Sequence, residues 1–189
     1  MIILASTSKY RKAQLQSLGI LFECISPDLN EDAVKLENID TKTKAEKLAL
    51  LKAEAVRAKY PNAIIIAGDQ IASIDEMILS KPLTKENNLA QLQKLQGKTH
   101  YLYTSNVILI DGKAITHTEI TKLTMKAFTD AQLKGYIDFA EPMDCAGGYK
   151  IELGGIALFD KIETNDFNSI QGMNLVFIAK ELGNHIWKS

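Results

Sequence analysis

The chain of 189 residues has few of the residues that build metal clusters and covalent cross-links. It contains two cysteines and three histidines, and neither type shows the spacing of zinc ligands. No secretory signal precedes Cys24 and Cys145, so we expect both thiols to be reduced and the protein to be cytoplasmic. We therefore expect neither a structural zinc site nor a disulfide framework.

An excess of charge of one sign and long hydrophobic runs are lacking as well. The chain has 22 basic and 23 acidic residues, a net charge of −1. Broad binding to nucleic acid needs a basic surface, and no apolar stretch is long enough to span a bilayer. We therefore expect no nucleic-acid partner and no membrane partner. A small phosphorylated ligand needs only a local basic pocket, although the Walker and GxGxxG glycine patterns are absent.

The remaining composition is that of one soluble globular domain over residues 1–189, because 46% of the residues are hydrophobic and 24% are charged. Strand patterns occur at residues 2–5, 20–25, 64–71, 100–110, 113–128 and 155–162. Helix patterns occur at residues 9–18, 41–60, 85–97, 130–139 and 170–182. Asp111-Gly112 is a strong hairpin signal. The pattern predicts an α/β fold with a mixed sheet, because hairpins interrupt the alternation.

A lysine stands on the apolar stripe of the longest expected helix. Leu48, Lys52 and Val56 are each four residues apart and share one face. An unpaired buried ammonium group is costly, so Lys52 must reach water, a carboxylate or an anion. The alternative is that its long side chain extends from the edge of the stripe to solvent.

A hydroxyl-rich turn and an arginine follow the first expected strand. The free N–H groups and partial positive charge of a helix N-terminus suit phosphate. Ser6 and Ser8 can add hydroxyl donors, and Arg11 can bind phosphate with two hydrogen bonds. Spacing alone favours the alternative, in which Ser8 is only an N-cap and Arg11 lies on the surface.

Three further charged residues are candidates for a phosphate and metal site. Asp69 follows Gly68 at the expected end of a strand, where a carboxylate can hold Mg²⁺ or orient water, or can merely cap a turn. Lys81 can neutralise phosphate charge, although alone it has the pattern of an exposed loop lysine. Glu31 can add a metal ligand, although acidic loops are usually just solvated.

Together these segments resemble the Maf family of nucleotide pyrophosphatases, in the family's order and over nearly the whole chain. The matching segments are 4–8 with Arg11, Glu31, 48–53, 68–69, 81–83, 95–98, 136–142, 145–149 and 168–172. The resemblance implies an elongated mixed β-sheet flanked by helices, with two lobes around a central cleft. It also implies hydrolysis of nucleoside triphosphates between the α and β phosphates with a divalent cation, Mg²⁺ or Mn²⁺. A homodimer is expected from the resemblance alone.

The resemblance also assigns roles by position. Asp69 matches the acid/base or metal-orienting carboxylate, and Glu31 matches a residue that assists with the metal. Five side chains match residues that hold the triphosphate: Ser6, Ser8, Arg11, Lys52 and Lys81.

Three positions are associated with the choice of base in the family. The branch acting on UTP and dTTP has arginine, threonine and glutamine there, whereas the branch acting on 7-methyl-GTP has an aromatic residue, glutamine and glutamate. This chain has Tyr10, Gln70 and Glu152. A cationic 7-methylguanine over an aromatic face gains roughly 0.5–2 kcal/mol, and a carboxylate can accept from the two adjacent N–H groups of guanine. The alternatives are a core-facing tyrosine and a surface glutamate.

The chain departs from the family pattern beside these residues, with Lys9 in place of proline, Lys12 in place of arginine, and Met173-Asn174 in place of Leu-Pro.

From the resemblance we expect a pyrophosphatase that removes 7-methyl-GTP or related modified nucleotides. The alternatives are a UTP and dTTP pyrophosphatase of the same family, and a nucleotide-binding regulator of cell division with little turnover.

Overall fold

The computed structural model describes residues 1–34, 36–75 and 77–187, and within them seven strands form one sheet. The strand order is β2-β1-β3-β5-β6-β7, and β4 pairs with β3. The strands are β1 (Ile2–Leu4), β2 (Glu23–Cys24), β3 (Ile64–Ile74), β4 (Met77–Leu79), β5 (Thr99–Ile110), β6 (Lys113–Met125) and β7 (Phe159–Glu163). β1 runs parallel to β2 and β3, whereas β4 and β7 are antiparallel to β3 and β6.

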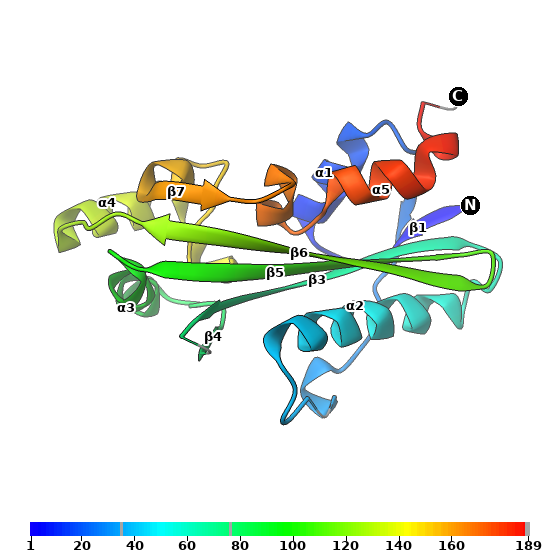
Figure 1. Cartoon of the computed structure of the whole chain (residues 1–189), viewed down its shortest axis with the longest axis horizontal. Coiled ribbons are helices and arrows are strands. Elements are labelled where there is room, and N and C mark those ends of the chain that lie inside the picture. The colour runs from blue at the N-terminus through cyan, green and yellow to red at the C-terminus, as the bar shows by residue number, and fades with distance from the viewer. Residues whose placement is uncertain (35, 76, 188–189) are drawn as a thin grey trace. The chain divides into compact units, whose positions relative to one another are not determined.

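Five α-helices accompany the sheet in the described part of the chain (Figure 1). They are α1 (Lys9–Ser17), α2 (Thr41–Arg57), α3 (Lys85–Leu95), α4 (Asp130–Ala140) and α5 (Leu175–Leu182). The predicted α/β class, with a mixed sheet and flanking helices, is confirmed. None of the described helices combines the length and the apolarity that crossing a bilayer requires.

The chain divides into two compact units built from separate segments. Unit 1 comprises Met1–Gln70, Tyr103–Glu119 and Asp166–Ser189, and unit 2 comprises Ile71–Leu102 and Ile120–Asn165. The strands β3, β5 and β6 each contribute residues to both units. The single domain over residues 1–189, the elongated outline and the cleft stay predictions.

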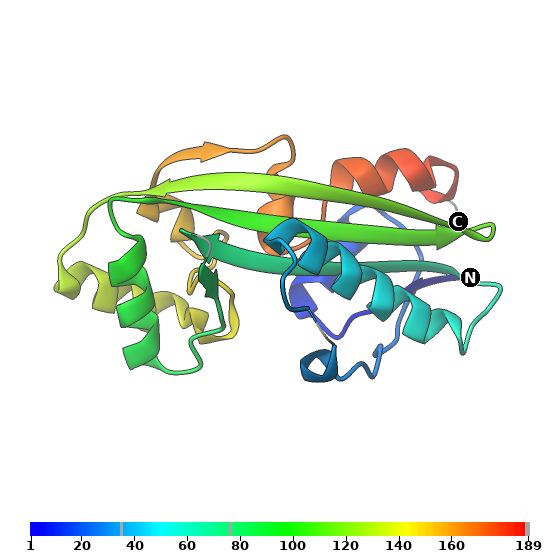
Figure 2. The ribbon, with the colours of Figure 1, turned by 60° about the horizontal axis from the view of Figure 1, so that its bottom comes forward.

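The core of unit 1 has two layers because side chains alternate between the faces of a strand. Ile3, Ile65 and Ala67 pack under α2, together with Ala49 and Ala53 of that helix. The residues of opposite parity, such as Leu4 and Ile66, pack under α1 and α5. Figures 1 and 2 show α2 on one face of the sheet in this unit, and α1 and α5 on the other.

Unit 2 holds α3, α4, β4 and β7, and α3 packs against α4. Its interior contains an aromatic cluster of His100, Tyr149 and Phe159, with ring centroids 5.0 to 5.8 Å apart. The Nε2 atom of His100 lies 2.9 Å from the hydroxyl of Tyr149. Burial lowers the pKa of His100 to about 4 and raises the pKa of Tyr149, so both groups are neutral at pH 7.

Three predicted elements differ most from the observed bounds. The strand predicted at 20–25 is short because Ile20 is a buried core residue outside the ladder. The strand predicted at 155–162 begins at Phe159, because Gly154 (φ 72°) starts a 3₁₀ turn. The helix predicted at 170–182 begins at Leu175, where Asn174 caps it by accepting from the Phe177 N–H at 2.7 Å.

Candidate active site

Asp69 lies in the middle of a strand, and its predicted place at the end of a strand is wrong. β3 continues to Ile74 because Ile71 to Ile74 is still a largely apolar run, and β4 pairs with its last three residues. Asp69 has the parity of Ile65 and Ala67, so its side chain lies on the α2 face. The turn-capping alternative is therefore excluded.

Lys52 forms the centre of a buried ionic cluster with Asp69 and Glu31. Its Nζ atom lies 2.6 Å from Oδ1 of Asp69 and 3.0 Å from Oε1 of Glu31. The side chains of Lys52 and Asp69 are each 9% exposed, whereas that of Glu31 is 50% exposed. Because the ammonium group is buried, the alternative in which Lys52 extends to solvent is wrong. The cluster opens toward solvent on the side of Glu31.

Arg11 belongs to the same charged neighbourhood. The guanidinium Nε donates to the carbonyl oxygen of Gly172 at 3.3 Å, and the side chain is only partly exposed. Burial lowers the pKa of Arg11, and the negative charges of Asp69 and Glu31 act in the opposite direction. The arginine remains charged at neutral pH, so unit 1 gathers two cations and two carboxylates in one place.

The serines shape the start of α1. The Ser6 hydroxyl accepts from the N–H of Ser8 at 3.1 Å, and the Ser8 hydroxyl accepts from the N–H of Arg11 at 3.4 Å. Ser8 is thus the N-cap of α1, as the alternative for this residue predicted. Both oxygens act here as acceptors, which leaves the O–H of each serine able to donate to an anion. Their role as triphosphate ligands stays a prediction.

Tyr10 and Gln70, two of the three residues associated with the base, also belong to unit 1. Tyr10 is half-buried, and the ammonium of Lys9 lies 5.0 Å from the centre of its ring. The ring face is therefore placed where it can attract a cation. Gln70 has the opposite parity to Asp69, and its amide nitrogen donates to Thr104, Ser169 and Ile170.

Lys81 and Glu152 belong to unit 2, and both side chains are exposed. Lys81 lies in the loop that follows β4. Glu152 lies in a turn in which the carbonyl of Lys150 accepts from the N–H groups of Leu153 and Gly155. The exposed positions agree with the alternatives for these residues, and their part in a site with Asp69 stays a prediction.

Sequence reasoning missed the polar residues of β5 that meet the segment before α5. Thr104 and Asn106 are fully buried and point to the same face as Gln70. Gly68 is required beside them, because a Cβ atom there would lie 2.5 Å from Nδ2 of Asn106. The signal in the sequence is the polar run Thr104-Ser105-Asn106, which stands directly before the apolar run 107–110.

The carboxylates of Glu31 and Asp69 are suited to a divalent cation. No cluster of three or more histidine, cysteine or acidic side chains that could hold a metal lies among the described residues. Mg²⁺, however, is usually held in proteins by one or two carboxylates together with substrate phosphates. Glu31 and Asp69 already converge on one cation, the ammonium of Lys52. They therefore fit a metal that arrives with a phosphorylated ligand.

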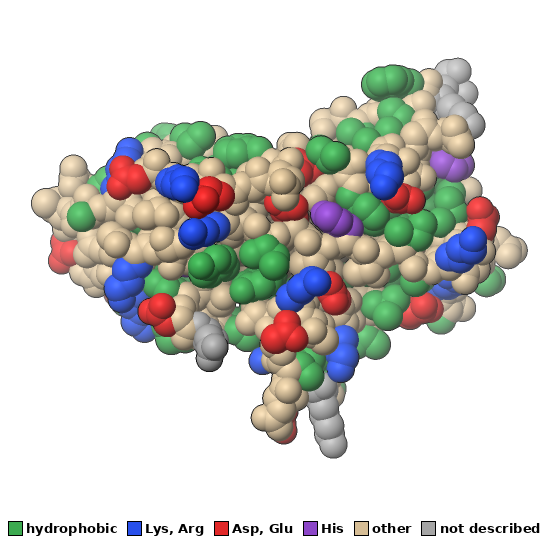
Figure 3. All heavy atoms as spheres, viewed as in Figure 1, with side chains coloured by type: hydrophobic (Ala, Val, Ile, Leu, Met, Phe, Trp, Pro, Cys, Tyr) green, Lys and Arg blue, Asp and Glu red, His purple; other side chains and the backbone are tan. Residues whose placement is uncertain are grey.

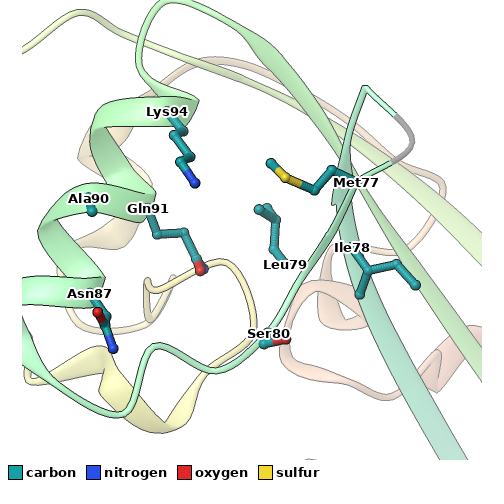
Figure 4. A pocket seen from close by; sticks show the side chains of 8 residues that line it. All are labelled: Met77, Ile78, Leu79, Ser80, Asn87, Ala90, Gln91 and Lys94. Carbon is teal, nitrogen blue, oxygen red and sulfur yellow. The ribbon is translucent and has the colours of Figure 1, made fainter.

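A separate pocket in unit 2 lies between β4 and α3 (Figure 4). It has a volume of about 240 Å³, and its lining includes Met77, Leu79, Asn87, Gln91 and Lys94. Among the described residues that line it, Lys94 is the only charged one. The cluster around Asp69 remains the candidate for phosphate chemistry.

The chain is similar over nearly its whole length to several known proteins. The chain is 43% identical over 183 residues to a 7-methyl-GTP pyrophosphatase of Bdellovibrio bacteriovorus, covering 97% of this chain and 96% of that protein. It is 36% identical over 186 residues to a nucleoside triphosphate pyrophosphatase of Acinetobacter baylyi, covering 96% of this chain and 93% of that protein. A 7-methyl-GTP pyrophosphatase of Hydrogenovibrio crunogenus is 38% identical over 183 residues, or 96% of this chain and 90% of that protein.

A solved structure supports the fold. The Ham1 protein of Staphylococcus aureus superposes with a TM-score of 0.52 over 95% of this chain and 98% of its own, at 16% sequence identity. At that identity the likeness concerns the fold alone. The sequence model of the family described as "Maf-like protein" matches residues 1–185. This chain therefore belongs to the Maf-like protein family.

Proposed function

We propose that the protein hydrolyses nucleoside triphosphates to the monophosphate and pyrophosphate, and that 7-methyl-GTP is its preferred substrate. The observation that carries the proposal is the buried cluster in which Lys52 joins Asp69 and Glu31, close to Arg11. Such a cluster combines groups that bind phosphate with groups that activate water. The names of the 43% and 36% identical relatives support the same chemistry.

The side chains of unit 1 have separate proposed roles in the hydrolysis. Asp69 orients the attacking water and accepts its proton, because its carboxylate is the buried acidic group of the cluster. Lys52 and Arg11 stabilise the negative charge that grows on the departing pyrophosphate. Ser6 and Ser8 add hydroxyl donors at the start of α1.

Glu31 and Asp69 would hold a divalent cation, Mg²⁺ or Mn²⁺, beside the phosphates. Once bound, the cation would act as a Lewis acid on the phosphate oxygens. Lys52 then has a second role, because it keeps the two carboxylates together without the metal. Removal of the cation with EDTA should abolish turnover.

The preference for 7-methyl-GTP rests on Tyr10 and Glu152. The Tyr10 ring already lies 5.0 Å from one cation, the Lys9 ammonium, and a methylated guanine would offer another. Glu152 is exposed and can accept from the Watson–Crick edge of guanine. The 36% identical relative has the broader name nucleoside triphosphate pyrophosphatase, which keeps UTP and dTTP as the second candidate substrates. These names support an enzyme, and none of them supports a regulator of cell division with little turnover.

A nucleotide panel tests the proposal. Pyrophosphate release is measured with 7-methyl-GTP, GTP, UTP and dTTP, each with Mg²⁺, with Mn²⁺ and with EDTA. We expect the highest kcat/KM for 7-methyl-GTP and no turnover in EDTA. Higher kcat/KM for UTP and dTTP would favour the second candidate. Binding of all four nucleotides without pyrophosphate release would contradict the proposal.

The remaining properties stay predictions of the same proposal. The face in Figure 3 shows acidic and basic side chains interspersed, as the near-neutral net charge suggests. We propose a cytoplasmic protein with a small nucleotide as its ligand and without nucleic-acid or membrane partners. Cys24 and Cys145 are both free, as predicted. A homodimer remains the expected assembly.

A further inference from the structure

The segment of residues 168–172, which precedes α5, is held by side chains from three other elements. Its carbonyl oxygens accept hydrogen bonds from donors on α1, β3 and β5. The bonds outside β3 run from Gln14 to Asn168 (2.6 Å), from Thr104 to Ser169 (2.8 Å), and from Arg11 (3.3 Å) and Asn106 (3.5 Å) to Gly172. The backbone of this segment therefore fixes the position of Arg11, the arginine of the candidate site.

Gln70 supplies the donor from β3. Its Nε2 atom lies 2.8 Å from the carbonyl oxygen of Ser169, 3.2 Å from that of Ile170 and 2.9 Å from Oγ1 of Thr104. Carbonyl oxygens can only accept, so the atom that faces them must be the amide nitrogen. An amide nitrogen has two N–H bonds, and three protein oxygens already share them. The donor capacity of Gln70 is therefore used within the protein.

We propose that Gln70 is a positioning residue for the phosphate-binding side of the site, and that its amide donors do not read the base. The proposal rests on the function proposed above. Gln70 fixes the 168–172 segment, and this segment holds Arg11 through Gly172. Loss of the amide donor would displace Arg11, which faces a part common to every nucleoside triphosphate. The kcat/KM values for all nucleoside triphosphates should then fall by the same factor.

The decisive variant is Gln70→Met, which keeps the length of the side chain and removes both donors. We expect kcat/KM for 7-methyl-GTP, GTP and UTP to fall together by about tenfold, so that the ratio of 7-methyl-GTP to UTP stays within about twofold of the wild type. Glu152→Gln serves as the contrast, because a residue that reads the base should change that ratio.

Inorganic tripolyphosphate gives a readout that a base-reading role would not change, because it has the phosphate tail and no base. We expect Gln70→Met to weaken inhibition by tripolyphosphate by the same factor, about tenfold. An unchanged inhibition constant together with a change of more than about fivefold in the ratio of 7-methyl-GTP to UTP would overturn the proposal.

Thr104→Val protects the test against a Gln70 variant that fails to fold. Thr104 donates to the same carbonyl of Ser169 and has no proposed contact with the nucleotide, so its loss should weaken tripolyphosphate and all nucleotides in equal measure. A change of base preference in Thr104→Val would contradict the proposal. If the wild type hydrolyses no nucleotide, the proposed function fails, whereas calorimetric binding of tripolyphosphate to the same variants still tests the role of Gln70.

Discussion

Two lysine–aspartate pairs, one in each unit, have the same length and different surroundings. The distance from Nζ to Oδ1 is 2.6 Å both for Lys52–Asp69 in unit 1 and for Lys85–Asp138 in unit 2. The side chains of the first pair are each 9% exposed, whereas those of the second are 50% and 65% exposed. A charge without water costs more than a solvated one, so the same geometry has different energetic weight. Burial, and not distance, distinguishes the pair to which we assign a function.

The interiors of the two units also differ in the charge of their buried side chains. In unit 2 the aromatic cluster of His100, Tyr149 and Phe159 is neutral at pH 7, because burial shifts the titratable groups toward their uncharged forms. In unit 1 opposite charges are kept together around Lys52. Unit 1 thus keeps the charges on which the proposed chemistry depends, whereas the aromatic cluster of unit 2 is uncharged.

The largest effect on activity should come from replacing Asp69, the aspartate of the buried pair, with asparagine. Asp69→Asn removes the proposed proton acceptor and should lower kcat for 7-methyl-GTP by about 10²- to 10⁴-fold. Asp138→Asn is the matched control and should keep its activity, because its pair is exposed. Pyrophosphate release measures both, and circular dichroism checks the fold. Near-wild-type turnover in Asp69→Asn would refute the assignment.

The two lysines extend the comparison to stability. Lys52→Met leaves a buried carboxylate without its ammonium partner and should lower the free energy of unfolding by about 3 kcal/mol. Lys85→Met breaks the exposed pair, so its loss should be much smaller. Urea unfolding at pH 7 measures the difference. Adding Asp69→Asn to Lys52→Met should recover part of the loss, and two strictly additive losses would contradict a coupled pair.

Because His100 in the aromatic cluster of unit 2 is neutral when folded, the free energy of unfolding should depend on pH. The pKa of His100 is about 4 in the folded protein, whereas the ordinary value of 6.5 applies to the unfolded chain. Between these values the unfolded chain binds the proton and the folded chain does not, so the free energy of unfolding falls as the pH falls. We expect a loss of about 2 kcal/mol between pH 7 and pH 5, measured by urea unfolding.

The matched variant for this pH effect is His100→Phe, which removes the titrating ring. It should lose stability at pH 7, because the Tyr149 hydroxyl loses its partner, but its unfolding free energy should fall less between pH 7 and pH 5. Identical pH slopes for the variant and the wild type would show that His100 is not the group responsible.

The smallest effect should come from Glu152, the exposed carboxylate of unit 2 that we assign to recognition of the base. Glu152→Gln keeps the shape of the side chain and weakens acceptance from the guanine edge. It should lower the ratio of kcat/KM for 7-methyl-GTP to that for UTP by about tenfold. An equal loss for both nucleotides would show that Glu152 does not read the base.

The sequence allowed the ionic cluster to be predicted because a charge on an apolar stripe has few solutions. Lys52 was expected to reach water, a carboxylate or an anion, and it bonds to the carboxylates of Asp69 and Glu31. The place of Asp69 within its strand was predicted wrongly, because polar residues at positions 69 and 70 look like a strand end. Antiparallel pairing with β4, whose paired residues lie three to seven positions further along the chain, keeps the strand in the sheet as far as Ile74.

The role of Gln70 could not be deduced from the sequence, because its hydrogen-bond partners are far away in the chain. Its partners, Thr104 and the carbonyls of Ser169 and Ile170, lie 34 to 100 residues away in the chain. Local caps were predictable: Ser8, Thr84 and Asn174 accept from N–H groups three residues ahead. Of these three caps, that of Asn174 was missed, because Asn174 lies inside the helix predicted at 170–182.

The position of Asp69 within β3, one peptide bond from Gln70, has a consequence for how such enzymes diversify. The two side chains point to opposite faces of a single strand whose backbone is fixed by its neighbours. This rigid ladder holds the Asp69 side chain on the α2 face, and it can tolerate little change at that position. New nucleotide preferences should therefore arise by substitutions elsewhere, in helix ends and turns, while the hydrolytic core stays as it is.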